Sequence, residues 1–453
     1  EIVNFKKLYF WSFVVSLAGF LFGFDTIVIS GAEQDIQQLW GDYTLFGRND
    51  LFHGIIIVGS ALWGTVLGAL LGAIPSDKYG RKNTLFLIGL LYTISAIGSS
   101  FAMNPWVFGI FRFIGGLGVG ASTIAAPSYI SEIAPQEKRG RLVAAYQFNI
   151  VFGILIAFIS NALFAEFIED TAWRWMVGIE ALPAIIYTLL AWRLPKSPRW
   201  LISSNNDIEG AKSIFSLSYH NPAMIEKQIA LIVGSSKKTH DRESIFTKKY
   251  RISLSLAFFI SFFNQFSGIN AILYYANRIF AVAGLEEQAG ALGTIGLGVT
   301  NFIFTLLGMF LIDRLGRKQL LYIGSFGYII SLTLVSLCFF NNWYGLIVPT
   351  SLFLFIASHA IGQGAVIWVL ISEIFPNHLR SKGQSFGSSV HWLLAAIIPS
   401  VVPTLFNSIG AGIVFAIFAF MMLLQLIWVK FYVPETKGRT LEELSKSLMT
   451  RYD

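Results

Sequence analysis

Twelve long apolar stretches dominate this sequence and limit what it can fold into. A helix that crosses the hydrocarbon core of a bilayer needs about 20 mostly apolar residues, and spanning segments satisfy their backbone polar groups most simply as helices. The stretches run at about residues 9–30, 51–75, 83–103, 106–130, 142–165, 172–194, 250–283, 288–312, 319–341, 344–373, 383–407 and 410–432. We therefore predict an all-α integral membrane protein with twelve transmembrane helices.

The composition supports this class. Of the 453 residues, 55% are hydrophobic and only 13% are charged, whereas soluble domains carry about 25% charged residues. Too few polar side chains remain to cover a water-facing surface, which excludes a string of soluble domains. The single Cys338 excludes a disulfide framework and a cysteine-based metal site.

The basic residues alternate from loop to loop. Of the 33 Lys and Arg residues, 28 fall in the two tails and in the loops after the even-numbered stretches. Cytoplasmic loops carry an excess of Lys and Arg, so both termini and the segment 195–249 are predicted to be cytoplasmic, in a plasma or bacterial inner membrane. The net charge of +7 is then a sign of topology, and no nucleic-acid partner is expected.

Three motifs recur at nearly one spacing. Asp77-Lys78-Tyr79-Gly80-Arg81-Lys82 returns as Asp313-Arg314-Leu315-Gly316-Arg317-Lys318, Ser131-Glu132-Ile133-Ala134-Pro135 as Ser372-Glu373-Ile374-Phe375-Pro376, and Pro195-Lys196-Ser197 as Pro434-Glu435-Thr436. The repeats predict two six-helix halves, at 1–194 and 250–432, with a cytoplasmic linker of short helices at 195–249 and a cytoplasmic tail at 433–453. One short helix is expected to begin near Ile208. Halves related in this way around a central cavity are typical of transporters.

With further motifs in the same order, the chain resembles the sugar porter family of the major facilitator superfamily. The additional motifs are Gly23-Phe24-Asp25-Thr26, Arg112-Phe113-Ile114-Gly115-Gly116-Leu117-Gly118-Val119-Gly120, Pro195-Lys196-Ser197-Pro198-Arg199-Trp200-Leu201, Gln265-Phe266-Ser267-Gly268-Ile269-Asn270 and Pro434-Glu435-Thr436-Lys437-Gly438-Arg439. The pattern is closest to bacterial xylose and glucose proton symporters and is related to glucose facilitators. The resemblance implies the major facilitator fold and uptake of a monosaccharide with a proton by alternating access.

No enzyme chemistry is indicated. The sequence shows no nucleophile–base pair, no metal-ligand spacing and no Walker-type loop. The glycines between Arg112 and Gly120 follow no strand, so we interpret them as sites of close helix packing. We expect no cofactor other than the coupling proton, and a monomer in the lipid bilayer.

Three charged residues lie deep within the predicted spans. A charge at the bilayer centre is costly and is usually paired and functional. The resemblance implies that Asp25 is the proton site, Arg112 its partner and Glu180 an accessory acid. A change in the distance between Asp25 and Arg112 would alter proton affinity. The alternatives are a static salt bridge and, for Glu180, a carboxylate that reaches water from its helix end.

A sugar site needs a few polar groups on several helices and aromatic walls. The resemblance implies the sugar-binding residues Phe22, Gln147, Ile150, Asn264, Gln265, Asn270, Tyr274, Asn301, Gly364, Trp368, His391 and Trp392. In an ideal helix Gln265 and Asn270 would lie about 140° apart, so we predict a break at Ser267-Gly268 that lets both face one cavity. A second bend is expected at Gly362-Gln363-Gly364. Alternatively, the amides are hydrogen-bonding contacts between helices.

The chain departs from the family pattern at several of these positions. Asn264 stands where a glutamine is usual, Ala365 and Ile367 replace prolines, and His391 replaces an amide residue. Histidine changes charge near neutral pH, so His391 either makes binding pH-dependent or acts as a neutral substitute for the amide. These departures leave the identity of the sugar open.

Two symmetric charge clusters are expected at the cytoplasmic ends of the spans. Their members are Asp77, Arg81, Glu132 and Arg139 in the first half and Asp313, Arg317, Glu373 and Arg380 in the second. The resemblance implies a cytoplasmic gate that ties the halves together. Each exposed pair contributes about 0–1 kcal/mol, so the gate must be a network; the alternative is an ordinary charged membrane rim.

Three other functions remain open at this point. The chain could be a proton-independent facilitator, a non-transporting sugar sensor, or a symporter of polyols or inositol. Asp25 favours symport, because facilitators of the family generally carry Asn there. Sensors often carry long signalling tails.

Overall fold

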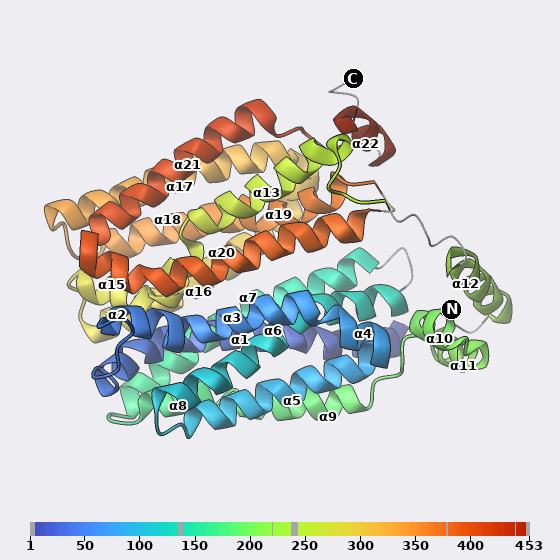
Figure 1. Cartoon of the computed structure of the whole chain (residues 1–453), viewed down its shortest axis with the longest axis horizontal. Helices are drawn as coiled ribbons and strands as arrows, with labels where there is room; N and C mark the ends of the chain where they lie inside the picture. Colours follow the sequence, from blue (N-terminus) through green and yellow to red (C-terminus); the bar gives the residue numbers. More distant parts are fainter. Residues whose placement is uncertain are drawn as a thin grey trace. The chain divides into compact units, whose positions relative to one another are not determined.

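The computed structural model describes residues 5–134, 139–219, 221–236, 243–376, 379–439 and 441–449, and within these ranges the regular elements are helices and no strand occurs (Figure 1). Twelve segments are long and apolar enough to cross a membrane. They are Lys6–Leu39, Asn49–Leu71, Arg81–Ser100, Pro105–Ile133, Leu142–Phe167, Ala172–Trp192, Lys248–Tyr274, Glu287–Leu315, Arg317–Asn341, Ile347–Glu373, Arg380–Ile409 and Ala411–Tyr432. The predicted helical class and the twelve spans are confirmed.

The spans are built from the following helices. The first half contains α1 (Phe5–Leu39), α2 (Asn49–Phe52), the π-helix η1 (His53–Val58), α3 (Gly59–Leu71), α4 (Ala73–Tyr79), α5 (Arg81–Ser100), α6 (Pro105–Ile133), α7 (Arg139–Phe167), α8 (Ala172–Gly178) and α9 (Ala181–Trp192). The linker contains α10 (Pro198–Asn205), α11 (Ile208–Ser218), α12 (Pro222–Ser236) and the 3-10 helix η2 (Lys248–Tyr250). The rest comprises α13 (Arg251–Phe266), α14 (Ile269–Tyr274), α15 (Ala276–Val282), α16 (Glu287–Leu315), α17 (Arg317–Asn341), α18 (Ile347–Ile361), α19 (Gln363–Glu373), α20 (Arg380–Ile409), α21 (Ala411–Tyr432) and α22 (Leu441–Met449).

Local sequence explains several helix starts. Asn104 caps α6 by accepting a hydrogen bond from the Val107 amide at 3.0 Å, and Pro105 occupies the first turn. Asp207 caps α11 in the same way through the Gly210 amide at 2.8 Å. The predicted short helix that begins at Ile208 is confirmed.

Two spans are interrupted where the sequence predicts a break. Gly268 adopts φ +83°, a left-handed conformation that ends α13 and starts α14. Gly362 has φ −86° and ψ −101°, outside the helical region, and separates α18 from α19. The π-helix η1 in the second span is an interruption that the sequence pattern did not predict.

The chain packs as two compact units. Unit 1 comprises Glu1–Thr26, Trp63–Ile154 and Arg174–Arg242, and unit 2 comprises Ile27–Leu62, Leu155–Trp173 and Glu243–Asp453. These units are defined by packing, whereas the predicted boundaries at 194, 249 and 432 follow membrane topology. The division by topology therefore stays a prediction.

In unit 1, α5 packs between α6 and α9 (Figure 1). Tyr92, Tyr129 and Tyr187 are fully buried at the centre of this core. A Cβ at Gly120 would lie 2.3 Å from the Thr65 carbonyl oxygen, so α6 and α3 approach with no side chain between them. The interpretation of this glycine as a close-packing position is confirmed.

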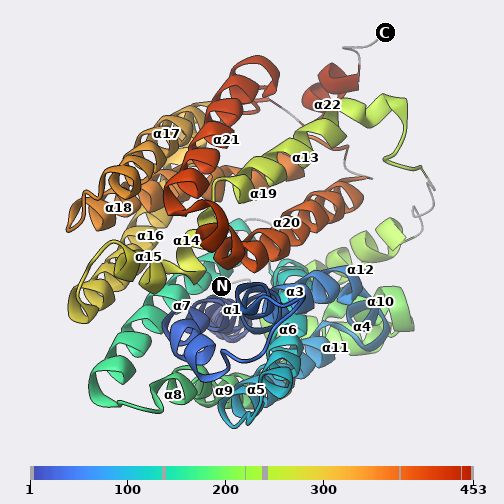
Figure 2. The same cartoon turned by 60° about the vertical axis from the view of Figure 1, so that its left-hand side comes forward.

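The linker helices α10, α11 and α12 form a small apolar cluster of their own in unit 1 (Figure 2). Trp200 of α10 donates from Nε1 to the Asp77 carbonyl oxygen at 2.7 Å, which ties this cluster to α4. In unit 2, α17 lies beside α18 and α21 in both views.

Candidate transport site

Asp25 and Arg112 form a buried ion pair inside unit 1. The Arg112 Nη1 donates to Asp25 Oδ1 at 2.8 Å, and its Nη2 donates to the Asp25 carbonyl oxygen at 3.0 Å. Asp25 is 1% exposed and Arg112 is 2% exposed. The guanidinium thus contacts both the side chain and the backbone of α1. The structure brings these two predicted residues together.

Glu180 lies within electrostatic range of this pair. Its carboxylate interacts with both Asp25 and Arg112, and the residue is 1% exposed. Among the described residues, Glu180 Oε1 has no hydrogen-bond partner. At 1% exposure the Glu180 side chain does not extend to water. The structure therefore disagrees with the alternative of a carboxylate that reaches solvent.

Two hydroxyl groups that sequence reasoning missed lie near the pair. Tyr92 of α5 lies within electrostatic range of Asp25 and Glu180. A Cβ at Gly115 would lie 2.4 Å from Ser95 Oγ and 3.6 Å from Asp25 Oδ1, so this glycine allows Ser95 to approach. Neither hydroxyl has a hydrogen-bond partner in the described part of the chain. Both residues lie in span 3 and are uncharged, so the rule that marks charged residues within spans does not identify them.

Phe22, Gln147 and Ile150, the other predicted site residues of unit 1, lie on α1 and α7. Phe22 and Ile150 pack against the unit 1 core and are half-buried, as is Gln147. A Cβ at Gly23 would lie 2.0 Å from the Ile150 carbonyl oxygen, which brings α1 and α7 into backbone contact beside Asp25. Phe22 therefore shares α1 with Asp25, and Gln147 and Ile150 lie on α7, which packs against α1 beside that residue.

The break at Gly268 aligns the amides of span 7. Asn270 Nδ2 donates to Gln265 Oε1 at 2.8 Å across the break. The two side chains therefore meet, as the predicted interruption requires. The Gln265 Nε2 donates to Asn264 Oδ1 at 2.9 Å and lies 3.0 Å from His391 Nε2.

This hydrogen-bond pattern assigns the tautomer of His391. Because Gln265 Oε1 accepts from Asn270, its Nε2 is the donor, and His391 Nε2 must accept. A neutral His391 then carries its proton on Nδ1, which has no partner among the described residues. The ring packs edge-on against Trp368 at 5.0 Å and Trp392 at 4.8 Å between centroids. This geometry suits the neutral amide substitute of the two sequence interpretations.

Asn264 joins this group to a further row of buried polar side chains. Its Nδ2 donates to Gln363 Oε1 at 3.3 Å, Gln363 donates to Gln425 at 2.8 Å, and Gln425 donates to Ser325 Oγ at 2.7 Å. Sequence reasoning treated Gln363 only as part of a bend and missed Gln425. Both are fully buried, and polar residues within apolar spans were the available signal.

Three other predicted residues lie in unit 2. Asn301 is 8% exposed and accepts a hydrogen bond from Thr305 Oγ1 at 3.4 Å. Gly364 lies against His359. Tyr274 is buried at the end of α14.

The first predicted charge cluster forms within unit 1. Arg81 Nε donates to Glu132 Oε1 at 3.0 Å, and its Nη1 donates to Asp77 Oδ1 at 2.8 Å. Ser197 donates a short hydrogen bond to Glu132. The side chain of Arg139 lies outside the described residues.

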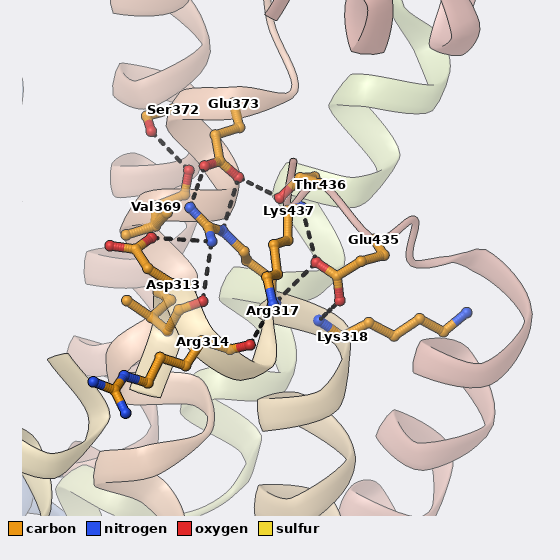
Figure 3. Close-up of polar contacts among 11 residues, drawn as sticks. Asp313, Arg314, Arg317, Lys318, Val369, Ser372, Glu373, Glu435, Thr436 and Lys437 are labelled. Atoms are coloured by element: carbon orange, nitrogen blue, oxygen red, sulfur yellow. Dashed lines mark hydrogen bonds and ion pairs between the residues drawn. The ribbon is translucent and has the colours of Figure 1, made fainter. Parts of the chain in front are cut away.

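The second cluster repeats this arrangement within unit 2 (Figure 3). Arg317 Nη2 donates to Glu373 Oε1 at 2.6 Å, and its Nη1 approaches Asp313 Oδ1 at 3.3 Å. Thr436 donates to Glu373, as Ser197 does to Glu132. Arg380 begins α20 and is half-buried.

Glu435 adds a contact that the sequence did not predict. Its carboxylate accepts hydrogen bonds from the Arg317 and Lys318 amides, both at 3.0 Å, and so caps the start of α17 (Figure 3). An anion at a helix N-terminus is stabilising. The repeat of Pro195-Lys196-Ser197 as Pro434-Glu435-Thr436 signalled the hydroxyl contacts but not this cap, since the first half has Lys196 at the matching position.

The profile of the family described as "Sugar (and other) transporter" matches residues 11–448. The chain belongs to this sugar transporter family. It is 32% identical over 475 residues to the D-xylose-proton symporter of Escherichia coli K12, covering 97% of this chain and 96% of the relative. It is 33% identical over 465 residues to the glucose transport protein of Synechocystis, covering 97% of each chain.

Solved structures agree with the sequence relatives. The fold matches a partially occluded inward-open structure of the E. coli xylose transporter with a TM-score of 0.84 at 30% identity, over 96% of this chain and 99% of that one. It matches a structure of the same symporter bound to 6-bromo-6-deoxy-D-glucose with a TM-score of 0.78 at 31% identity, over 98% and 100% of the chains. The predicted family and the major facilitator fold are confirmed. This sugar transporter is a multi-pass membrane protein and not an enzyme.

Proposed function

We propose that this sugar transporter imports a monosaccharide, a pentose or a hexose such as xylose or glucose, together with a proton by alternating access. The observation that carries the proposal is the buried Asp25–Arg112 pair, with Glu180 beside it. Charged side chains inside a membrane are costly, so they are usually paired with one another and usually have a function. The names of the xylose and glucose relatives support the substrate class.

Proton and arginine compete for the same carboxylate oxygen. Arg112 Nη1 occupies Asp25 Oδ1 at 2.8 Å, and a protonated Asp25 no longer attracts the guanidinium as an anion does. A movement of α1 against α6 that separates the two groups therefore favours proton uptake, and their reunion releases the proton. Each state of the pair biases one arrangement of the helices, as a coupled carrier requires.

Sugar binding is assigned to the amides and indoles of unit 2, and Phe22, Gln147 and Ile150 of unit 1 stay predictions from the sequence. Gln265, Asn270 and His391 already form one hydrogen-bonded group, and Trp368 and Trp392 flank it. Such a set offers both donors and acceptors to hydroxyl groups and aromatic faces to C–H surfaces. The two charge clusters at Glu132 and Glu373 are proposed as the cytoplasmic gate.

The location follows from the charge distribution. Because Lys and Arg concentrate on one side, we propose a cell membrane with both termini in the cytoplasm. The proton is the coupling ion, and no other cofactor is proposed. We further propose that the protein works as a monomer and that 1–194 and 250–432 form its two halves.

Uptake of labelled pentoses, hexoses and polyols into proteoliposomes under an imposed pH gradient tests this function. A potential of about 100 mV supplies about 2.3 kcal/mol per proton, enough for roughly fortyfold accumulation of a neutral sugar. Asp25→Asn should abolish accumulation while leaving exchange of sugar across the membrane. Glu226→Gln, at an exposed linker ion pair, is the matched control and should accumulate sugar like the wild type.

Two outcomes would contradict the proposal. If Asp25→Asn still concentrates sugar against its gradient, Asp25 is not the coupling site. If the wild type equilibrates sugar but never concentrates it, with or without an uncoupler, the protein is a facilitator. Preferential uptake of a polyol would replace the proposed substrate class.

A further inference from the structure

A second buried charge cluster occupies the opposite end of α1 from its N-terminus. Glu33 is 0% exposed, and Arg278 of α15 binds both of its oxygens, with Nη2 at 2.6 Å from Oε2 and Nε at 3.0 Å from Oε1. His53 of η1 lies 2.8 Å from Oε2 through Nε2. Arg278 also donates to Gln37. These four residues, the outer charge cluster, all belong to unit 2.

The cluster joins one face of α1 to the start of α15. Ser30, Glu33 and Gln37 follow the spacing i, i+3 and i+7, which places them on one side of the helix. Asn277 Nδ2 donates to the Ser30 carbonyl oxygen at 3.2 Å, next to the Arg278 contacts. Two consecutive residues of α15 therefore bind the same face of α1.

The neighbouring elements close around this contact. A Cβ at Gly54 would lie 2.0 Å from the Ser400 carbonyl oxygen, so η1 packs directly on the backbone of α20. The Tyr275 hydroxyl, one residue before α15, donates to the Pro399 carbonyl oxygen at 2.6 Å. His53, which contacts Glu33, is the first residue of the π-helix η1. π-Bulges are frequent at functional sites.

The burial of this pair sets it apart from the cytoplasmic clusters. There, the glutamate side chains are 14% and 18% exposed, and Asp77 and Asp313 are largely exposed. Glu33 has no exposure, and its partner Arg278 is 15% exposed. Separating two opposite charges costs more free energy at a buried site than at a water-exposed one.

Glu33 and Arg278 also come from different repeats, on spans 1 and 7. We propose that the Glu33–Arg278 ion pair is the lock of the external gate, which holds α15 against α1 and must break each time the carrier opens to the outside. This inference rests on the proposed alternating access and on the proposed topology, which puts this end of α1 outside. It does not depend on the sugar or on proton coupling.

External accessibility of a buried cysteine tests the lock. Ser30→Cys is nearly isosteric, Ser30 is 1% exposed, and Cys338→Ser removes the native thiol. The measurement is the rate at which a membrane-impermeant thiol reagent modifies Cys at position 30 in intact cells, without sugar. Glu33→Gln and Arg278→Gln should each raise this rate roughly tenfold or more. The first leaves Arg278 without its carboxylate, and the second leaves the buried Glu33 with only the His53 imidazole beside it.

The double variant and a control sharpen the test. Glu33→Gln with Arg278→Gln removes both charges and replaces the ion pair by a weaker amide contact, so its rate should exceed that of the parent but lie well below the product of the two single effects. Arg48→Gln is the matched control. Arg48 carries the same charge as Arg278 and directly precedes the second span, but its side chain is 46% exposed. Its labelling rate should stay within about twofold of the parent.

The lock is refuted if both single variants label at the parental rate, or if the double variant shows the full product of the single effects. Should the single variants fail to fold, as judged by gel filtration in detergent, the double variant alone decides, and a parental labelling rate in it refutes the lock. Labelling needs no transported sugar, so a failure of the proposed substrate or of proton coupling leaves this result interpretable.

Discussion

Gly268 provides the sharpest test of how the break in span 7 is maintained. The residue adopts φ +83°, and a Cβ there would lie 2.5 Å from Cδ2 of the Phe418 ring. Gly268→Ala therefore meets two costs. A left-handed conformation costs an L-residue about 1–2 kcal/mol, and an added methyl group in a packed core costs about 1–3 kcal/mol.

The chain offers a matched control that separates these costs. Gly284 adopts φ +77° with its nearest side-chain atoms 3.6 Å from the added Cβ. Gly284→Ala thus carries the backbone cost without the clash. We expect Gly268→Ala to destabilise the protein by about 1–3 kcal/mol more than Gly284→Ala.

The assay is thermal unfolding in detergent, followed by sugar uptake for the variants that remain folded. Gly268→Ala should show a lower unfolding midpoint than Gly284→Ala. It should also lose uptake, because a shifted break moves Asn270 away from Gln265. If it matches Gly284→Ala in midpoint and the wild type in uptake, the break is not required for the alignment of these amides.

Two further predictions concern the buried polar contacts of unit 2. Gln363→Leu should lower stability by about 1–3 kcal/mol, since Asn264 and Gln425 each lose a buried partner; thermal unfolding measures this, and an unchanged midpoint would show that the row of amides is not stabilising. Arg317→Lys keeps the charge but loses the paired hydrogen bonds to Glu373, so uptake should fall severalfold, and wild-type uptake would show that charge alone suffices at this cluster.

Much of the fold followed from periodicity, composition and repeats. Apolar length alone predicted the twelve spans, because the bilayer fixes the length of a helix that crosses it. Gly268 and Gly362 also marked the breaks correctly, since glycine tolerates conformations that end a helix. The π-helix at His53–Val58 had no such signal. Its sequence, His-Gly-Ile-Ile-Ile-Val, contains no proline, and η1 packs against α20 at Gly54.

The site was partly predictable for a different reason. Asp25 and Arg112 stood out because charges are rare within spans, and the structure pairs them. Glu33 was overlooked although it is also charged, because it lies near the end of its span, where a carboxylate ordinarily reaches water. Its burial depends on Arg278, which is 245 residues away in the sequence. No local pattern could reveal that pairing.

The row of amides in unit 2 has a direction. Asn270 donates to Gln265, Gln265 to Asn264, Asn264 to Gln363 and Gln363 to Gln425, and the row ends on the Ser325 hydroxyl. Hydrogen bonds aligned head to tail polarise one another. A ligand hydroxyl that donates to the half-buried Asn270 would therefore strengthen every later hydrogen bond in the row, as far as the buried Ser325.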